Sequence, residues 1–277
     1  MNALMNRLSP RVRSLISKFR ETDVVSLGAQ LSYYLILAFF PFLIFLISLI
    51  GYFRLSSDTL MDILVRLLPN ATGSSIRDVV NEVTANQSGA LLSFGLLGSI
   101  WSASGAVNAM IKGLNKAYGE QEHRAIWRVR GISLLATLVL AAIIIVSMAL
   151  LVFGETIQQE LLTRLGAPEH WSRIWSVLQV VVPVVVLFCV FLLLYRMTPD
   201  RRLTWSEVIP GSVFAAIGWI ASSLLFSFYV NNFGNYSKTY GSLGGVIVLL
   251  IWLYLSSIIL LVGGILNAEF ANNKQQL

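Results

Sequence analysis

The stretch Thr239–Ala268 reads TYGSLGGVIVLLIWLYLSSIILLVGGILNA and contains no charged residue. Its 30 residues exceed the roughly 20 that an α-helix needs to cross about 30 Å of hydrocarbon. The stretch therefore predicts a membrane span rather than a buried helix of a soluble core. The rest of the chain repeats this pattern.

The whole chain has the composition of a membrane protein. Of its 277 residues, 56% are hydrophobic and 12% are charged, with a mean hydropathy of +0.73, whereas soluble domains carry about 25% charged residues. The single cysteine, Cys189, excludes a disulfide framework within the chain. The amino-terminal region lacks the short apolar segment and cleavage site of a signal peptide, so we expect no cleavage.

Five further uncharged runs are long enough to span a membrane. Together the six runs predict an all-α, polytopic membrane protein with six transmembrane helices and short amphipathic helices at the interface. The predicted division is a basic amphipathic segment at 1–23, a six-span membrane domain at 24–269 and a short cytoplasmic tail at 270–277. The spans are expected at about residues 29–53, 88–111, 131–154, 174–195, 209–231 and 242–267.

The basic residues predict the orientation of the chain. Six spans place both termini on one side of the membrane, and most of the 20 lysines and arginines fall on that side. The positive-inside rule therefore predicts that both termini are cytoplasmic. Because orientation accounts for most of the net charge of +6, the charge gives little support to nucleic-acid binding. We expect membrane lipids as partners and no nucleic acid.

Two regions outside the spans have amphipathic patterns. Before the first span, Val12, Leu15, Ile16 and Phe19 follow helical spacing beside several basic residues. This segment is either a helix lying in the inner-leaflet interface or a helix docked on the bundle. The segment 56–87 holds two shorter patterns, which we expect to pack on the outer membrane surface.

Small and polar residues indicate which spans lie inside the bundle. The second span is rich in serine and glycine and is expected in the interior, whereas the third is aliphatic on all sides and is expected to face lipid. In the first span, Pro41 is expected to kink the helix. On the fifth span, Gly211, Ala215, Gly218 and Ser222 form a stripe of small residues. We expect the sixth span to pack on this stripe.

The residue pattern predicts no enzyme. We find no nucleophile with a base, no paired carboxylates and no metal-ligand cluster, so we expect no catalytic residue, cofactor or metal site. His123 and His170 are predicted on opposite sides of the membrane. Uncharged polar residues within and beside the spans are either structural hydrogen-bonding groups or the lining of a cavity. The candidate cavity-lining residues are Tyr33, Tyr34, Ser102, Asn108, Gln179, Tyr229, Tyr240, Tyr254 and Asn267, of which Tyr254 is expected to point into the bundle and bond a polar group.

The order and spacing of several short motifs resemble one known family. The motifs are Tyr33-Tyr34 with Pro41, the small-residue run to Asn108, Leu114-Asn115-Lys-Ala-Tyr118, Tyr195-Arg-Met-Thr-Pro199, Pro210-Gly211, Phe228-Tyr229, Tyr240-Gly241-Ser242, Trp252-Leu-Tyr254 and Gly263 to Asn267-Ala-Glu269. From about Arg20 to Ala271 the chain is similar to the YihY/virulence factor BrkB family of bacterial inner-membrane proteins. Tyr118 stands where that family often has tryptophan.

The resemblance implies a multi-pass protein of the bacterial plasma membrane with six spans and no settled activity. Some relatives are linked to serum resistance or envelope lipid handling, and the family was once labelled ribonuclease BN. Our leading hypothesis is transport or handling of a lipid-like or amphipathic envelope solute. One alternative is a non-transporting scaffold in envelope biogenesis, with envelope proteins or further copies of the chain as partners. A tRNA-processing ribonuclease is disfavoured, because no metal cluster or histidine pair is visible.

Overall fold

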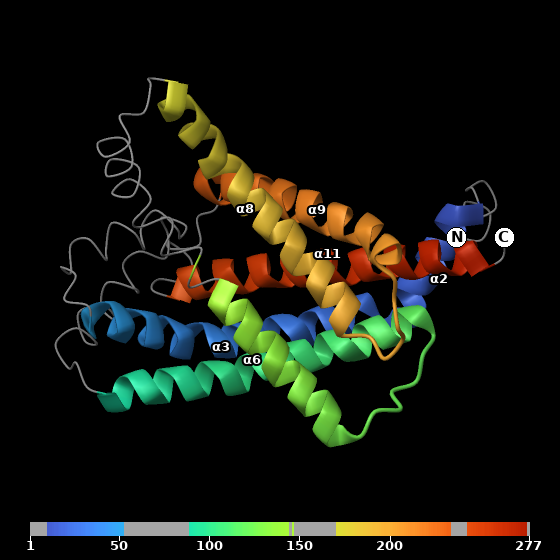
Figure 1. Ribbon diagram of the computed structural model, residues 1–277, viewed down its shortest axis with the longest axis horizontal. Helices are drawn as coiled ribbons and strands as arrows, with labels where there is room; N and C mark the ends of the chain where they lie inside the picture. Colours follow the sequence, from blue (N-terminus) through green and yellow to red (C-terminus); the bar gives the residue numbers. More distant parts are fainter. Residues whose placement is uncertain (1–9, 53–88, 144–145, 147–169, 234–242, 276–277) are drawn as a thin grey trace.

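The computed structural model describes residues 10–52, 89–143, 146, 170–233 and 243–275 (Figure 1). The helices within these residues are α2 (Pro10–Thr22), α3 (Val24–Tyr52), α6 (Gly89–Tyr118), a helix over Ile126–Ile143, α8 (His170–Met197), α9 (Trp205–Phe233) and α11 (Gly244–Gln275). Five of them are long and apolar enough to cross a membrane, and α8 adds a shorter apolar portion, Val181–Met197. The prediction of an all-α, polytopic membrane protein is confirmed. The amphipathic segment 56–87 and the turn after α9 lie outside the described residues.

Local signals in the sequence set several helix ends. Gly119 follows α6 with φ of 71°, and its N–H and that of Glu120 close back onto the carbonyls of Lys116 and Asn115. This is the Schellman arrangement, which favours glycine because of the positive φ. At the start of α9, the Thr204 N–H and hydroxyl both donate to the Glu207 carboxylate, while the Glu207 N–H donates to the Thr204 carbonyl. The Glu207 carboxylate thus satisfies the Thr204 N–H, which is the carboxylate half of a capping box.

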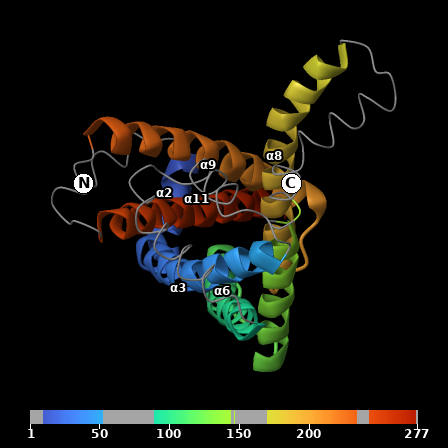
Figure 2. The same cartoon turned by 90° about the vertical axis from the view of Figure 1, so that its left-hand side faces the viewer.

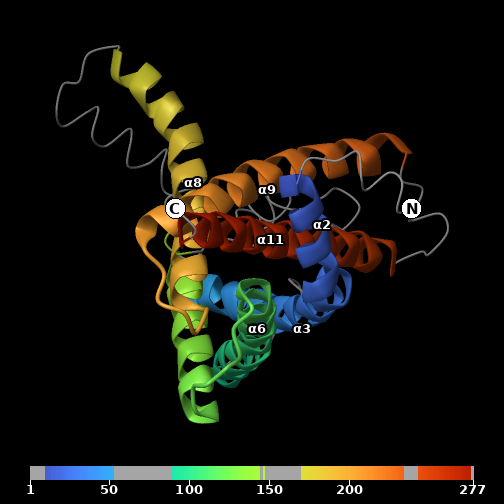
Figure 3. The same cartoon turned by 90° about the vertical axis from the view of Figure 1, so that its right-hand side faces the viewer.

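The long helices form a row that two others cross. The row runs α9, α11, α3, α6, with α11 contacting α9, α3 and α6 (Figure 1). The helix Ile126–Ile143 and α8 run obliquely to this row. Seen from the two ends in Figures 2 and 3, they lie together on one side of it. The central position of α11 agrees with the long uncharged run that marks it in the sequence.

Small residues bring α9 and α11 into backbone contact. A Cβ placed on Gly211 of α9 would overlap the carbonyl oxygen of Gly263 on α11. Further along the stripe, a Cβ on Gly218 would lie 3.2 Å from Ile259, and the Trp252 indole donates to the Ser223 hydroxyl at 3.1 Å. The predicted packing of the sixth span on the small-residue stripe of the fifth is confirmed.

The contact of α3 with α6 also depends on glycine. A Cβ on Gly95 would approach the backbone of Phe45 and the carbonyl of Pro41 within 3 Å, and Gly98 faces the Pro41 ring. Among the five spans, α6 is the most buried, as expected from its small residues. In contrast, Leu134, Leu135 and Leu138 on the helix Ile126–Ile143 are exposed, as expected for a helix that faces lipid.

The amphipathic segment at the amino-terminal side is a helix docked on the bundle. Leu15 and Phe19 of α2 pack against the main hydrophobic core, and α2 contacts α11 and α6. The Lys18 ammonium lies 3.1 Å from the Glu269 carboxylate of α11, which also accepts a hydrogen bond from Ser14. Of the two alternatives considered for this segment, the structure has the docked one. The end of the bundle that carries α2 is called the α2 end below.

We predict that Gly211→Ala destabilises the protein, because the new methyl group must push two backbones apart. The expected loss is about 1–3 kcal/mol, the usual cost of overpacking. Gly131→Ala is the matched control, since nothing lies within 4 Å of its Cβ position. The control should stabilise its helix by up to about 1 kcal/mol. Thermal unfolding in one detergent measures both variants, and equal midpoints would contradict the close crossing.

Candidate functional site

Asn267 lies at the centre of the α9–α11 crossing. Its side chain is fully buried, and its Oδ1 accepts a hydrogen bond of 2.6 Å from the Gly211 N–H. Beside it, the Tyr195 hydroxyl of α8 donates to the Leu260 carbonyl at 2.6 Å. The Asn267 Nδ2 has no hydrogen-bond partner among the described residues. The Asn267 carbonyl oxygen therefore joins α11 to α9, while the NH₂ group has no hydrogen-bond partner among the described residues.

The other predicted cavity residues lie at separate places. Tyr34 packs its ring on Gly105 of α6, and Ser102 and Asn108 lie half-buried three residues before and after that glycine. The neighbouring Tyr33 is 56% exposed. Thus Tyr34 packs on the face of α6 that also carries Ser102 and Asn108, whereas Asn267 belongs to the α9–α11 contact.

The remaining candidates belong to the other helices. Tyr254 is half-buried with its ring on Gly28 of α3, so it faces the bundle; a hydrogen bond from its hydroxyl stays a prediction. Tyr229 is 47% exposed on α9. Tyr240 and the side chain of Gln179 lie outside the described part of the chain. A single cavity lined by all nine residues stays a prediction.

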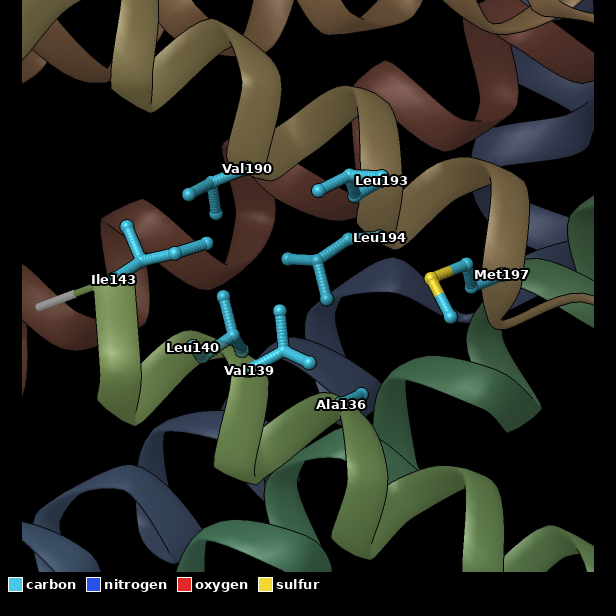
Figure 4. A pocket seen from close by; sticks show the side chains of 8 residues that line it. All are labelled: Ala136, Val139, Leu140, Ile143, Val190, Leu193, Leu194 and Met197. Atoms are coloured by element: carbon cyan, nitrogen blue, oxygen red, sulfur yellow. The ribbon is translucent and has the colours of Figure 1, made fainter.

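An apolar groove runs between the two crossing helices. Its walls are Ala136, Val139, Leu140 and Ile143 on one helix and Val190, Leu193, Leu194 and Met197 on α8 (Figure 4). Every lining side chain is apolar, as the close view shows. Val139 is 37% exposed and Met197 is 42% exposed, so the groove is open along one side. Both helices have apolar surfaces suited to a membrane, so we expect this open side to face hydrocarbon.

A charged network lies next to Met197, the last groove residue of α8. Met197 is followed directly by Thr198, whose carbonyl accepts a hydrogen bond of 2.9 Å from Arg124. The same guanidinium binds the Glu122 carboxylate through two bonds of 2.7 Å and lies 3.2 Å from Asp200. Asn115 of α6 donates to Glu122 and accepts from the Asp200 N–H, each at 2.8 Å. We call these five residues the loop network, since they join the loop after α6 to the loop after α8.

The electrostatics of the loop network centre on Arg124. Its side chain is only 9% exposed, so the two carboxylates compensate a largely buried charge. Hydrogen bonds from Arg124 lower the pKa of Glu122 below its ordinary value of 4.5. The Glu122 bonds and charge in turn raise the pKa of Arg124. The bidentate Arg124–Glu122 pair orients the guanidinium within its own loop. The contacts of Arg124 with the Thr198 carbonyl and Asp200 then join this loop to the loop after α8.

His123 lies beside the loop network. It is 73% exposed at its side chain, and its Nδ1 lies 3.5 Å from Asp200. No group of three or more His, Cys, Asp or Glu side chains with a metal-binding arrangement occurs among the residues that the structure describes.

Five helices long and apolar enough to cross a membrane, joined through small residues, define a polytopic α-helical membrane protein. The model of the family described as Virulence factor BrkB matches residues 15–277, and the chain belongs to that family. The similarity that the sequence motifs indicated is thereby confirmed.

Relatives of the chain are bacterial proteins. The ribonuclease-like protein YfkH of Bacillus subtilis is 39% identical over 264 residues, covering 95% of this chain and 96% of its own. A UPF0761 membrane protein of Pseudoalteromonas atlantica is 24% identical over 91% of this chain and 83% of its own. Another, from Idiomarina loihiensis, is 34% identical over 40% of this chain and 39% of its own. No solved structure matches the chain.

Sequence reasoning did not find the loop network or the groove. Arg124 meets Thr198 and Asp200, which lie more than 70 residues further along the chain, so local patterns do not indicate these contacts. One available signal was the position of Asn115 in a motif shared with the family, since an asparagine at a helix end is well placed to bond neighbouring loops. The groove residues carry no signal, because alternating aliphatic side chains also suit plain lipid contact.

We predict that Arg124→Gln loosens the two loops. The variant removes the charged partner of Glu122 and Asp200, and the expected loss is about 1.5–3 kcal/mol, as for hydrogen bonds to charged groups. Arg128→Gln is the control: this exposed arginine makes no ion pair with any described residue, so a change within about 0.5 kcal/mol is expected. Hydrogen exchange at the amide of Asp200 measures the local effect. Equal exchange in both variants would contradict the network.

The lowered pKa of Glu122 predicts a pH dependence. A carboxyl whose folded-state pKa is depressed stabilises the fold above its ordinary value of 4.5, and this contribution is lost as pH falls through the lower folded-state value. Between pH 7 and pH values below that range, we expect the wild type to lose more stability than Glu122→Gln. Thermal unfolding at a series of pH values checks this. Parallel pH curves for the two proteins would show that Glu122 is not coupled to Arg124.

Proposed function

We propose that this protein handles or moves a lipid-like, amphipathic solute in the membrane. The observation that carries the proposal is the apolar groove, which opens toward hydrocarbon and ends at a polar network. An apolar tail suits the groove, and a polar headgroup suits the region of the two loops. The same surface offers no polar contacts for a small hydrophilic solute.

The distribution of charge in the spans supports a lipid-like solute. In the described spans, charged residues lie within about two turns of a helix end, such as Lys112 and Lys116 on α6 or Glu269 on α11. Buried ionisable groups at mid-membrane are the usual mark of ion and proton pathways. The interior polar groups of the described helices, such as Asn267 and Ser104, instead form hydrogen bonds with backbone groups of the helices.

We propose that the protein lies in the bacterial plasma membrane with both termini in the cytoplasm. The start of α2 and the end of α11 share one end of the bundle through the Lys18–Glu269 pair. That end also carries the basic loops, which favour the cytoplasmic side. Reporter fusions at the carboxyl terminus test the orientation: a reporter active only in the periplasm should be silent there.

An enzymatic activity is not part of the proposal. The name of the Bacillus relative mentions ribonuclease, but the basic loops here hold acids and bases in mutual ion pairs rather than in a nucleophile–base arrangement. RNA cleavage by purified protein that disappears in His123→Ala would count against this view. Cleavage that persists in that variant would point to a contaminant.

We predict that filling the groove slows lipid movement. Val139→Trp places a large ring in the open groove, whereas Leu138→Trp places it on the opposite, exposed face of the same helix. In proteoliposomes, fluorescent phospholipid should change leaflets faster with wild-type protein than in protein-free vesicles. Val139→Trp should reduce this rate several-fold and Leu138→Trp should leave it unchanged.

Two outcomes would contradict the proposal. If folded wild-type protein moves no phospholipid, the transport role fails and the scaffold alternative gains. Crosslinking in cells then discriminates, because a scaffold yields a partner in fixed stoichiometry. If both tryptophan variants slow movement equally, the groove is not the route.

A further inference from the structure

The loops around the groove carry more positive charge than the loop network neutralises. Residues 116–130 and 196–207 together contain seven Lys or Arg and four Asp or Glu residues. Two of these acids, Glu122 and Asp200, are both engaged by Arg124. Arg196 stacks on the Trp205 ring at 4.0 Å and donates to the Leu203 carbonyl. The excess positive charge of these two segments therefore comes from basic side chains other than Arg124 and Arg196.

Arg128 and Arg130 are exposed cations in the first turns of the helix that lines the groove. At about 100° per residue, Arg128 lies on the same face of this helix as the groove residue Val139, whereas Arg130 points to nearly the opposite side. Both are exposed, and neither makes an ion pair with another residue in the described part of the chain. They lie eight and six residues before Ala136, the first groove residue on the same helix, which corresponds to roughly 12 and 9 Å along the helix axis. Long side chains on a helix point back toward its amino terminus. The Arg128 guanidinium therefore extends from the groove toward the membrane surface.

The intervening residues anchor this part of the helix. Val129, between the two arginines, is buried against Val107 and Ile111 of α6. Trp127 is 87% exposed, as expected for an aromatic side chain at a membrane interface. The helix is thus held by α6 on one side, while Arg128 stays available to a ligand at headgroup depth.

We propose that the groove binds an anionic phospholipid, with an acyl chain along the apolar groove and the phosphate-bearing headgroup at Arg128. The inference rests on the proposed function and deepens it by naming the class of amphiphile. Charge complementarity selects the lipid: an exposed arginine without an ion-pair partner among the described residues favours a headgroup with net negative charge over a zwitterionic one. Arginine also matches phosphate geometry through paired N–H donors.

Photo-crosslinking to lipid tests the site directly. A photoreactive phenylalanine derivative replaces Met197 in the groove or, as matched control, Ile209 on α9; these residues are 42% and 44% exposed. The full chain is reconstituted in vesicles of equal parts phosphatidylglycerol and phosphatidylcholine, and captured lipids are identified by mass spectrometry. At Met197 we expect phosphatidylglycerol to exceed phosphatidylcholine about fivefold, the effect of one cation near an anionic headgroup. At Ile209 both lipids should be captured nearly equally.

The arginines are tested in the same assay. In Arg128→Gln, the lipid ratio at Met197 should fall to that at Ile209. Arg130→Gln, on the other side of the same helix, and Arg13→Gln, which removes an exposed charge from α2 at the same end, should leave the ratio unchanged. Equal capture of both lipids at Met197 in the wild type would overturn the inference, and so would a ratio that Arg128→Gln does not change. The wild-type comparison of the two positions decides the matter even if Arg128→Gln folds poorly.

The lipid-movement assay separates failure of this inference from failure of the proposed function. Movement of both lipids without enrichment at Met197 would overturn the anionic site and leave the transport role standing. Enrichment at Met197 in a protein that moves no lipid would support the site and remove the transport role.

Discussion

The close crossing of α9 and α11 is the constraint on which the rest of the structure depends. At Gly211 and Gly263 the two backbones meet without side chains between them, and Asn267 bonds one helix to the other. In a membrane there is little hydrophobic gain from joining helices, so close van der Waals contact and buried hydrogen bonds must hold them. Tyr195 brings α8 to the same place through the Leu260 carbonyl. Three helices are thus fixed at one level near the α2 end.

The crossing layer is held differently from the row. The helix Ile126–Ile143 and α8 share an apolar groove rather than a glycine contact, and the loop network joins their ends through Arg124. Aliphatic side chains against lipid gain little by closing such a groove, since hydrocarbon covers them equally well. Strong polar contacts at one end and an open apolar contact beside them form a region where an amphiphile can lie without disturbing the row.

Much of the fold was predictable because the membrane imposes length and polarity on each span. The uncharged runs, the interior position of α6 and the stripe from Gly211 to Ser222 were read correctly from local composition. The docking of α2 was not, because an amphipathic pattern suits an interface and a protein surface alike. The Lys18–Glu269 pair that decides between them joins residues at opposite ends of the chain.

The sequence by itself determined the class of protein, the number of apolar runs and the helices that must meet at small residues. Only the tertiary structure decided which side chains meet at the groove and in the loop network. The physical reason is the distance along the sequence over which residues interact. Span length and helix stripes depend on neighbours within a few turns. The contacts of Arg124 with Thr198 and Asp200 depend on how the loop after α6 meets the loop after α8. The composition of Thr239–Ala268 predicted a membrane span. Its contacts with α9 and α3 show that this span is the central helix of the row.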